Sequence, residues 1–156
     1  IWKEPAFLKT STKEAIFMDE VIIRKVQSIE RCLLRIEEEY KLAGEYFQTN
    51  YTHRDAAMLN LLRACEQSID LANQLIQIKK WEVPDSSWSS FEILIERKVL
   101  VPDLGNSLKK MVGFSYIVVH EYAKMNIKVV EKIIKEHLND FRSYCSTMLK
   151  FTGFGK

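Results

Sequence analysis

The sequence predicts an all-α protein, an up-and-down bundle of four main helices and a short one, and three observations carry that prediction. Apolar residues recur at intervals of three and four positions, which is the period of a helix with one buried face. Gly and Pro number only 5 and 3, too few for the frequent turns of an all-β fold. Hydrophobic residues make up 47% of the 156 positions and charged residues 28%, which suits one packed domain.

The first main helix is predicted over residues 19–42, and Gly44 is a natural stop after it. Its polar side carries opposite charges at helical spacing, and Arg31 and Arg35 belong to this solvated face. The opposite side is a continuous apolar stripe, which predicts burial against a neighbouring helix. The stripe consists of Ile22, Val26, Ile29, Leu33, Ile36 and Tyr40.

A second long helix is predicted over residues 52–80, with Thr52 as its N-cap. Residues 81–90 (WEVPDSSWSS) have the composition of a loop. A short apolar helix follows, because Ser89 and Glu92 have the spacing of a capping box.

The third main helix is predicted to open at Pro102, a good first-turn residue, and to run towards Gly113. The last main helix is predicted to be continuous over residues 127–148, where apolar residues again recur every three or four positions. The segment 113–126 between them fits a plain bundle poorly, because residues 117–119 are three consecutive β-branched side chains. We expect a bend or a helix break there, and a break allows polar side chains to converge on a ligand.

Residues 1–17 differ from the rest of the chain, because Pro5 and a Thr-Ser-Thr cluster interrupt any helical pattern. They are interpreted as an N-terminal extension, a tag-like remnant or a short docking arm. Met18 is a candidate native start, so the predicted domain spans residues 18–156.

Composition excludes several classes of protein. The net charge of +2 announces no strongly basic nucleic-acid binder, and no apolar run approaches the roughly 18 residues of a membrane span. The sequence contains no H-E-x-x-H motif and no phosphate-binding glycine loop, so we expect no metal and no cofactor. The cysteines are interpreted as small buried hydrophobic residues of a cytoplasmic protein, since they form no C-x-x-C pair. They are Cys32, Cys65 and Cys145.

Several segments together resemble one known family. Residues 100–114 (LVPDLGNSLKKMVGF), 119–122 (VHEY) and 137–141 (HLNDF) resemble the C-terminal half of HepT-like proteins of the HEPN superfamily, and residues 26–33 and 62–72 resemble their first two helices. The resemblance spans nearly everything from residue 18 to residue 151. It implies a dimerising helical bundle and a metal-independent RNase toxin, whose partner is a small nucleotidyltransferase antitoxin of the MntA type.

The signature of that family is Arg, four residues, His, one residue, Tyr. The resemblance therefore assigns His120 as the catalytic histidine and Tyr122 as the tyrosine that the antitoxin modifies by nucleotidyl transfer. The position of the motif arginine is occupied by Ser115, and the usual Asn after it is Tyr116.

The chemistry explains why this substitution matters. A histidine near neutral pKa can move the proton of a 2′-hydroxyl, and a guanidinium can hold the phosphate and oppose its growing charge. Ser115 keeps a hydrogen bond but supplies no charge, and losing one such stabilising group costs about 10²–10³ in rate. Lys124 is a candidate replacement cation one turn beyond His120, and Glu121 could orient His120. Tyr116 shares a helix face with His120 and could stack on a base.

Three functions stay open at this point. The first is a toxin with RNase activity, neutralised by a nucleotidyltransferase that modifies Tyr122. The second is a catalytically impaired relative that keeps the dimer and the partner surface. The third is a helical substrate-binding partner of a nucleotidyltransferase.

Overall fold

The computed structural model describes residues 6–153, with side chains from residue 13 onward. This part of the chain contains six α-helices and no strand, which confirms the predicted all-α class. None of these helices combines the length and the apolar run that crossing a bilayer requires. In chain order the elements are α1 (Ala6–Ala43), η1 (Gly44–Tyr46), α2 (Tyr51–Ile78), α3 (Ser87–Glu96), α4 (Pro102–His120), η2 (Tyr122–Lys124), α5 (Ile127–Glu136) and α6 (Leu138–Leu149).

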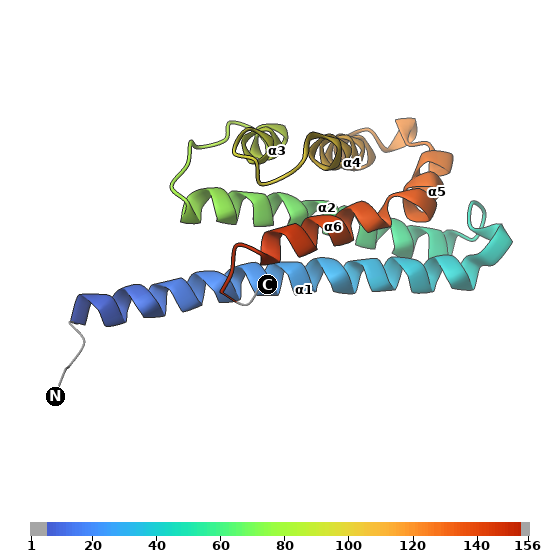
Figure 1. The fold of residues 1–156 in the computed structure, drawn as a ribbon. Helices are drawn as coiled ribbons and strands as arrows, with labels where there is room; N and C mark the ends of the chain where they lie inside the picture. Colours follow the sequence, from blue (N-terminus) through green and yellow to red (C-terminus); the bar gives the residue numbers. More distant parts are fainter. Residues whose placement is uncertain (1–5, 154–156) are drawn as a thin grey trace.

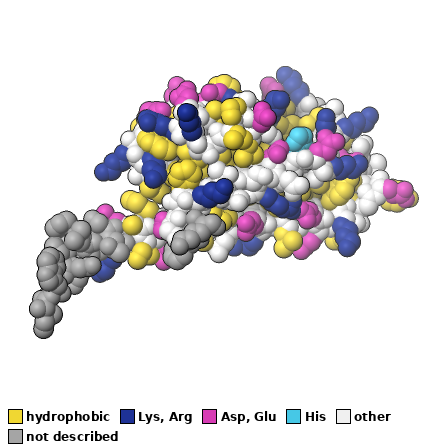
Figure 2. Space-filling model, in the orientation of Figure 1, with side chains coloured by type: hydrophobic (Ala, Val, Ile, Leu, Met, Phe, Trp, Pro, Cys, Tyr) yellow, Lys and Arg dark blue, Asp and Glu magenta, His cyan; other side chains and the backbone are white. Residues whose placement is uncertain are grey.

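The two longest helices, α1 and α2, form an antiparallel pair on which the other helices pack (Figure 1). Helix α6 runs along this pair, whereas α3 and α4 are seen nearly end-on and cross it (Figure 1). On the face shown in Figure 2, basic and acidic side chains are interspersed, so no field of a single sign covers that face.

The core lies between these layers. The predicted stripe of α1 is buried from Ile22 to Ile36, and only Tyr40 at its end is partly exposed. The ring of Tyr144 on α6 meets Phe91 on α3 edge-on, with the ring centroids 5.9 Å apart. Its hydroxyl donates to the carbonyl of Ser68 on α2 at 2.7 Å, so this buried polar group is satisfied and ties α6 to α2.

Three predicted helix starts were wrong. Helix α1 begins at Ala6 rather than near Asp19, and it runs past residue 18 without interruption. The division of the chain into residues 1–17 and 18–156 stays a prediction, and residues 1–5 lie outside the described part. The N-cap of α2 is Asn50, whose side chain accepts from the backbone N–H of His53. The capping box of α3 is formed by Ser86 and Ser89, one turn earlier than expected.

The predicted last helix is two helices, because the chain leaves helical geometry at His137 (φ −121°, ψ 1°). The backbone N–H of His137 closes α5 on the carbonyl of Ile133 at 2.8 Å, and its ring lies 3.0 Å from the carboxylate of Asp140 at the start of α6. The apolar spacing continues through this point, so periodicity gave no sign of the break.

Helix α4, which carries the candidate site, is positioned by a close contact with α3. A Cβ atom placed on Gly105 would collide with Cγ1 and Cδ1 of Ile95, so only glycine permits this approach. Helix α4 then continues through Gly113 and the β-branched residues 117–119 to His120. The expected break in segment 113–126 is confirmed, and it lies immediately after His120.

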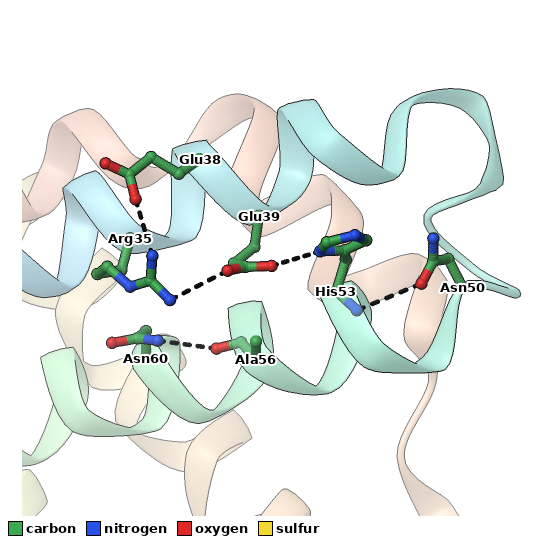
Figure 3. Close-up of polar contacts among 7 residues, drawn as sticks. All are labelled: Arg35, Glu38, Glu39, Asn50, His53, Ala56 and Asn60. Carbon is green, nitrogen blue, oxygen red and sulfur yellow. Dashed lines mark hydrogen bonds and ion pairs between the residues drawn. The ribbon is translucent and has the colours of Figure 1, made fainter.

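A polar network joins the end of α1 to the start of α2 (Figure 3). The buried carboxylate of Glu39 lies 2.5 Å from Nδ1 of His53 and accepts from Arg35 at 3.0 Å. Arg35 also donates to Glu38 at 2.9 Å. The hydrogen bond with His53 is the main reason why the pKa of Glu39 lies below its usual value, and the charges of His53 and Arg35 act in the same direction.

This network predicts a specific acid sensitivity. Because the pKa of Glu39 is lowered from 4.5 in the folded state, its contribution is complete above that pH and is lost as the pH falls through the lowered value. We expect His53→Ala to cost about 1 kcal/mol near neutral pH, or about 2–4 °C in Tm. The difference from the parent protein should shrink below pH 4.5. Thermal unfolding across a pH series, with the exposed Thr52→Ala variant as control, measures this; a difference that is constant with pH would contradict it.

The contact between α3 and α4 predicts opposite effects at two glycines of α4. Gly105→Ala should destabilise the protein by about 1 kcal/mol, because the overpacking cost exceeds the helix-propensity gain. Gly113→Ala is the matched control, since beyond its chain neighbours and the backbone of its own helix no atom lies within 4 Å of the added Cβ, and it should stabilise the protein by about 0.5–1 kcal/mol.

In an Ile95→Ala background the collision is removed, so Gly105→Ala should become stabilising there. Denaturant unfolding of the four proteins in this cycle measures the reversal. A Gly105→Ala variant that is as stable as Gly113→Ala in the parent background would contradict the argument.

Candidate functional site

The candidate site lies where α4 ends. Glu121 leaves the helix (φ −135°, ψ 52°), although its N–H still donates to the carbonyl of Ile117 at 2.8 Å. One tight turn follows. In it, the backbone N–H of Lys124 donates to the carbonyl of Glu121 at 2.8 Å, and the backbone N–H of Met125 donates to the carbonyl of Tyr122 at 3.0 Å. His120 is therefore the last helical residue, and Tyr122 opens the next turn.

His120 is exposed and is held against one neighbour. The rings of Tyr116 and His120 lie with their centroids 4.3 Å apart and their planes at 37°, which is the contact expected from positions one helical turn apart. Tyr116 is 63% exposed, so the predicted shared face exists and both rings are open to solvent. The arrangement orients the imidazole without covering it.

Tyr122 is also open to solvent, with 53% of its surface exposed. It follows His120 by two residues across the break, on the short element η2 rather than on α4. A modifying enzyme can reach a side chain in such a position without unfolding a helix.

Ser115 faces the interior of the bundle. Its hydroxyl donates to the carbonyl of Val112 at 2.7 Å, within the same helix. Burial raises the pKa of Cys65 on α2 to about 12, and a hydrogen bond with Ser115 opposes that shift, so the two side chains adjoin. The hydroxyl is thus engaged by backbone and thiol, and it is poorly placed to take the role of an arginine.

Lys124, the candidate replacement cation, and Lys109, a second lysine of the same region, are both engaged as well. Lys124 pairs with Glu121 at 3.5 Å, and both side chains are exposed. Lys109 is buried, pairs with Glu92 and lies 4.0 Å from the centre of the Trp88 ring, so it serves the α3–α4 contact. Neither lysine is a free cation beside His120.

The principal groove beside α4 lies on another side of the helix. It has a volume of about 620 Å³ between α4 and α5, and Lys110, Phe114 and Lys132 line it. Neither Tyr116 nor His120 lines this groove. The sequence-predicted residues are therefore gathered at the helix end and not in this groove. In residues 6–153, no three His, Cys, Asp or Glu side chains gather as a metal site would require.

One groove of the structure was not predictable from the sequence. Arg31 and Arg35 are exposed, which confirms the predicted solvated face, and together with Arg63 they line a groove between α1 and α2. Their spacing of four residues was visible in the sequence, but the position of Arg63 opposite them depends on how the two helices pack.

Fold and site together define an all-helical protein that presents an exposed His-x-Tyr pair at the end of a helix. A family model described as "Ribonuclease HepT-like" matches residues 29–148, so the chain belongs to the HepT-like ribonuclease family. This confirms the resemblance inferred from the motifs. The comparisons do not address the roles of Ser115, His120 and Tyr122, which stay predictions.

Individual relatives agree with this assignment. The chain is 37% identical over 127 residues to the "mRNA nuclease HepT" of Shewanella oneidensis, covering 81% of this chain and 95% of that protein. It is similar to the solved structure of a tri-AMPylated HEPN toxin from Shewanella oneidensis in complex with an MNT antitoxin, with a TM-score of 0.78, 36% identity and coverage of 82% and 96%. The cytosolic protein YutE of Bacillus subtilis shares the fold, with a TM-score of 0.65, 20% identity and coverage of 80% and 88%.

Proposed function

We propose that this protein is the ribonuclease toxin of a toxin–antitoxin pair, and that a nucleotidyltransferase antitoxin of the MntA type restrains it by modifying Tyr122. The main support for this proposal is that His120 and Tyr122 are both exposed at the end of α4 and have the spacing of the family motif. The chain is also 37% identical to an mRNA nuclease. The AMPylated state of a similar toxin supports the modification.

The proposed chemistry needs only the RNA and protein side chains. The imidazole of His120 takes the proton of a ribose 2′-hydroxyl, whose oxygen attacks the adjacent phosphorus, and the bond to the 5′-oxygen breaks. The leaving 5′-oxygen receives a proton from water, His120 gives the proton it has taken back to solvent, and a 2′,3′-cyclic phosphate remains. Tyr116 holds the imidazole ring in place at 4.3 Å. No metal or cofactor enters these steps.

Ser115 limits this reaction in the proposal. A phosphorane carries more negative charge than the substrate, and a group that stabilises it must be a cation or a strong donor aimed at it. The hydroxyl of Ser115 already donates to Val112, so it supplies neither. The second candidate function, a catalytically impaired relative that retains the partner surface, is favoured by this same contact.

Modification of Tyr122 is the step that inhibits the toxin in this proposal. The phenolic oxygen attacks the α-phosphorus of ATP, the bond to the β-phosphate breaks with release of pyrophosphate, and the phenolic proton passes to a base on the antitoxin. The added nucleotide brings negative charge and bulk two residues from His120, which opposes the approach of an RNA phosphate.

Two further parts of the proposal concern assembly and compartment. We propose a homodimer, in line with an exposed apolar surface around the site that contains Tyr116, Ile117 and Val119. We propose a cytoplasmic location, because all three cysteines are free thiols, which is the usual state in a reducing compartment.

A helical substrate-binding partner of a nucleotidyltransferase is the alternative function. That function requires the surface that binds the nucleotidyltransferase, and it does not require RNA cleavage.

The absence of an arginine at position 115 predicts a slow reaction that an arginine would accelerate. Ser115→Arg should raise the rate of RNA cleavage by about 10²–10³, because it restores a cation able to oppose the developing phosphate charge. Cleavage of a labelled RNA by the purified proteins measures this rate. Ser115→Gln is the matched control, since it adds length and a donor without charge, and it should give little increase.

The catalytic role of His120 is tested in the same assay. His120→Ala should abolish cleavage both in the parent protein and in the Ser115→Arg background. If neither Ser115→Arg nor His120→Ala changes the cleavage rate, the ribonuclease proposal is wrong.

The proposed modification of Tyr122 can be detected by mass. Incubation with ATP and the cognate nucleotidyltransferase should increase the mass of the protein by AMP units on a peptide that contains Tyr122, and Tyr122→Phe should prevent this at that residue. Peptide mass spectrometry locates the change. Tyr116→Phe is the control, because Tyr116 is an exposed tyrosine on the same surface. An unmodified Tyr122 beside an active antitoxin contradicts the proposal.

A further inference from the structure

A second polar site lies between α1 and α2, on residues that the proposed reaction does not use. It is a groove of about 540 Å³ whose lining includes three arginines and no carboxylate. Arg31 and Arg35 stand one turn apart on α1, a rise of about 6 Å, and Arg63 faces them from α2. Ser28 and Asn60 add polar groups to the lining.

The charges of this groove are unevenly compensated. Arg35 is fixed by Glu38 and Glu39 at 2.9 and 3.0 Å, and Asn60 of α2 lies beside it (Figure 3). Arg31 and Arg63 are exposed, and within residues 13–153 neither forms an ion pair with a carboxylate. Two uncompensated guanidinium groups therefore border the groove, beside a third that is held in place.

The floor of the groove shows that these two charges converge. Cys32 is buried there, with 8% of its surface exposed. Burial raises the pKa of its thiol, while the positive charges of Arg63 and Arg31 act against that shift. Both guanidinium groups therefore act on the same buried side chain, Arg31 from α1 and Arg63 from α2.

The residues that line the groove favour a phosphate-bearing ligand over a protein partner. A second copy of this chain would bring like charges together, which disfavours self-association at this surface. Protein interfaces are anchored by buried aromatic and large apolar side chains, and here Ala56 and Leu59 are the main apolar members of the lining. Guanidinium groups match the oxygens of a phosphate in a two-pronged geometry, and a nucleic-acid strand offers a phosphate at each nucleotide.

We propose that the groove between α1 and α2 is a binding site for the phosphate backbone of single-stranded RNA, with Arg31 and Arg63 as its principal contacts. The choice of RNA rests on the proposed ribonuclease function. The site is separate from His120 and holds substrate without taking part in the reaction. Arg35, fixed by its two glutamates, shapes the wall of the groove.

The test measures binding without cleavage. A labelled single-stranded RNA is titrated with the full chain carrying His120→Ala, and fluorescence anisotropy gives the affinity over a series of salt concentrations. Arg31→Gln with Arg63→Gln should weaken binding roughly tenfold at low salt and reduce the slope of log K against log salt by about 1.4, since each lost phosphate contact on a single strand accounts for about 0.7.

Two variants serve as controls for charge and for geometry. Arg24→Gln with Lys41→Gln removes the same charge from exposed positions of α1 outside the groove, and it should leave the slope unchanged. Arg31→Lys with Arg63→Lys keeps the charge and should retain the slope while losing part of the affinity. Circular dichroism and Tm verify that these surface variants are folded.

Each other outcome overturns the inference. Equal losses in the groove pair and in the control pair would mean that RNA binds through general charge alone. An unchanged RNA affinity in the groove pair, with or without weaker binding of a nucleotidyltransferase, would exclude RNA from the groove. Failure of the parent chain to cleave RNA counts only against the ribonuclease proposal, because binding is measured in a variant that lacks His120.

Discussion

The burial of one face of α1 against α2 is the constraint on which the rest of the structure depends. The stripe from Ile22 to Ile36 is removed from water by this pairing, and the tie of Glu39 to His53 fixes the helix ends relative to each other. The hydrophobic contribution of such a stripe is large, at about 1.5–3 kcal/mol for each fully buried aliphatic side chain. Helices α3, α4 and α6 pack on this pair, so the end of α4 and the groove beside Arg63 are both set by it.

The sequence predicted the features that follow from periodic burial and from local motifs. The stripe of α1, the opening of α4 at Pro102 and the family motif around His120 are of this kind. The break at His137 was not predictable, because apolar spacing continues through it and only the backbone departs from the helix. The groove was missed for another reason. Arg31 and Arg63 are 32 positions apart, and only the packing of α1 on α2 brings them to one place.

At the candidate site, His120 and Tyr122 are accessible to solvent, but the motif arginine is replaced by Ser115. His120 and Tyr122 are both exposed, and they lie on either side of the end of α4. Ser115 lies one turn earlier, on the side of α4 that faces Cys65, and its short side chain is bound to its own helix. An arginine would be long enough to leave that environment and would carry a charge, whereas serine is short and neutral. In the proposed mechanism, modification of Tyr122 is therefore retained, while the chemistry at His120 is weakened.

Cations in the groove cannot replace that missing charge. In the proposal, contacts of Arg31 and Arg63 with the RNA backbone would be equal in the substrate and in the transition state, because the groove is lined by α1 and α2 and by no residue of α4, which carries His120. Binding that is uniform along the reaction lowers KM and leaves kcat unchanged. Only a group beside His120 that meets the growing charge can raise kcat. A chain with this groove and with Ser115 should therefore hold RNA well and cut it slowly.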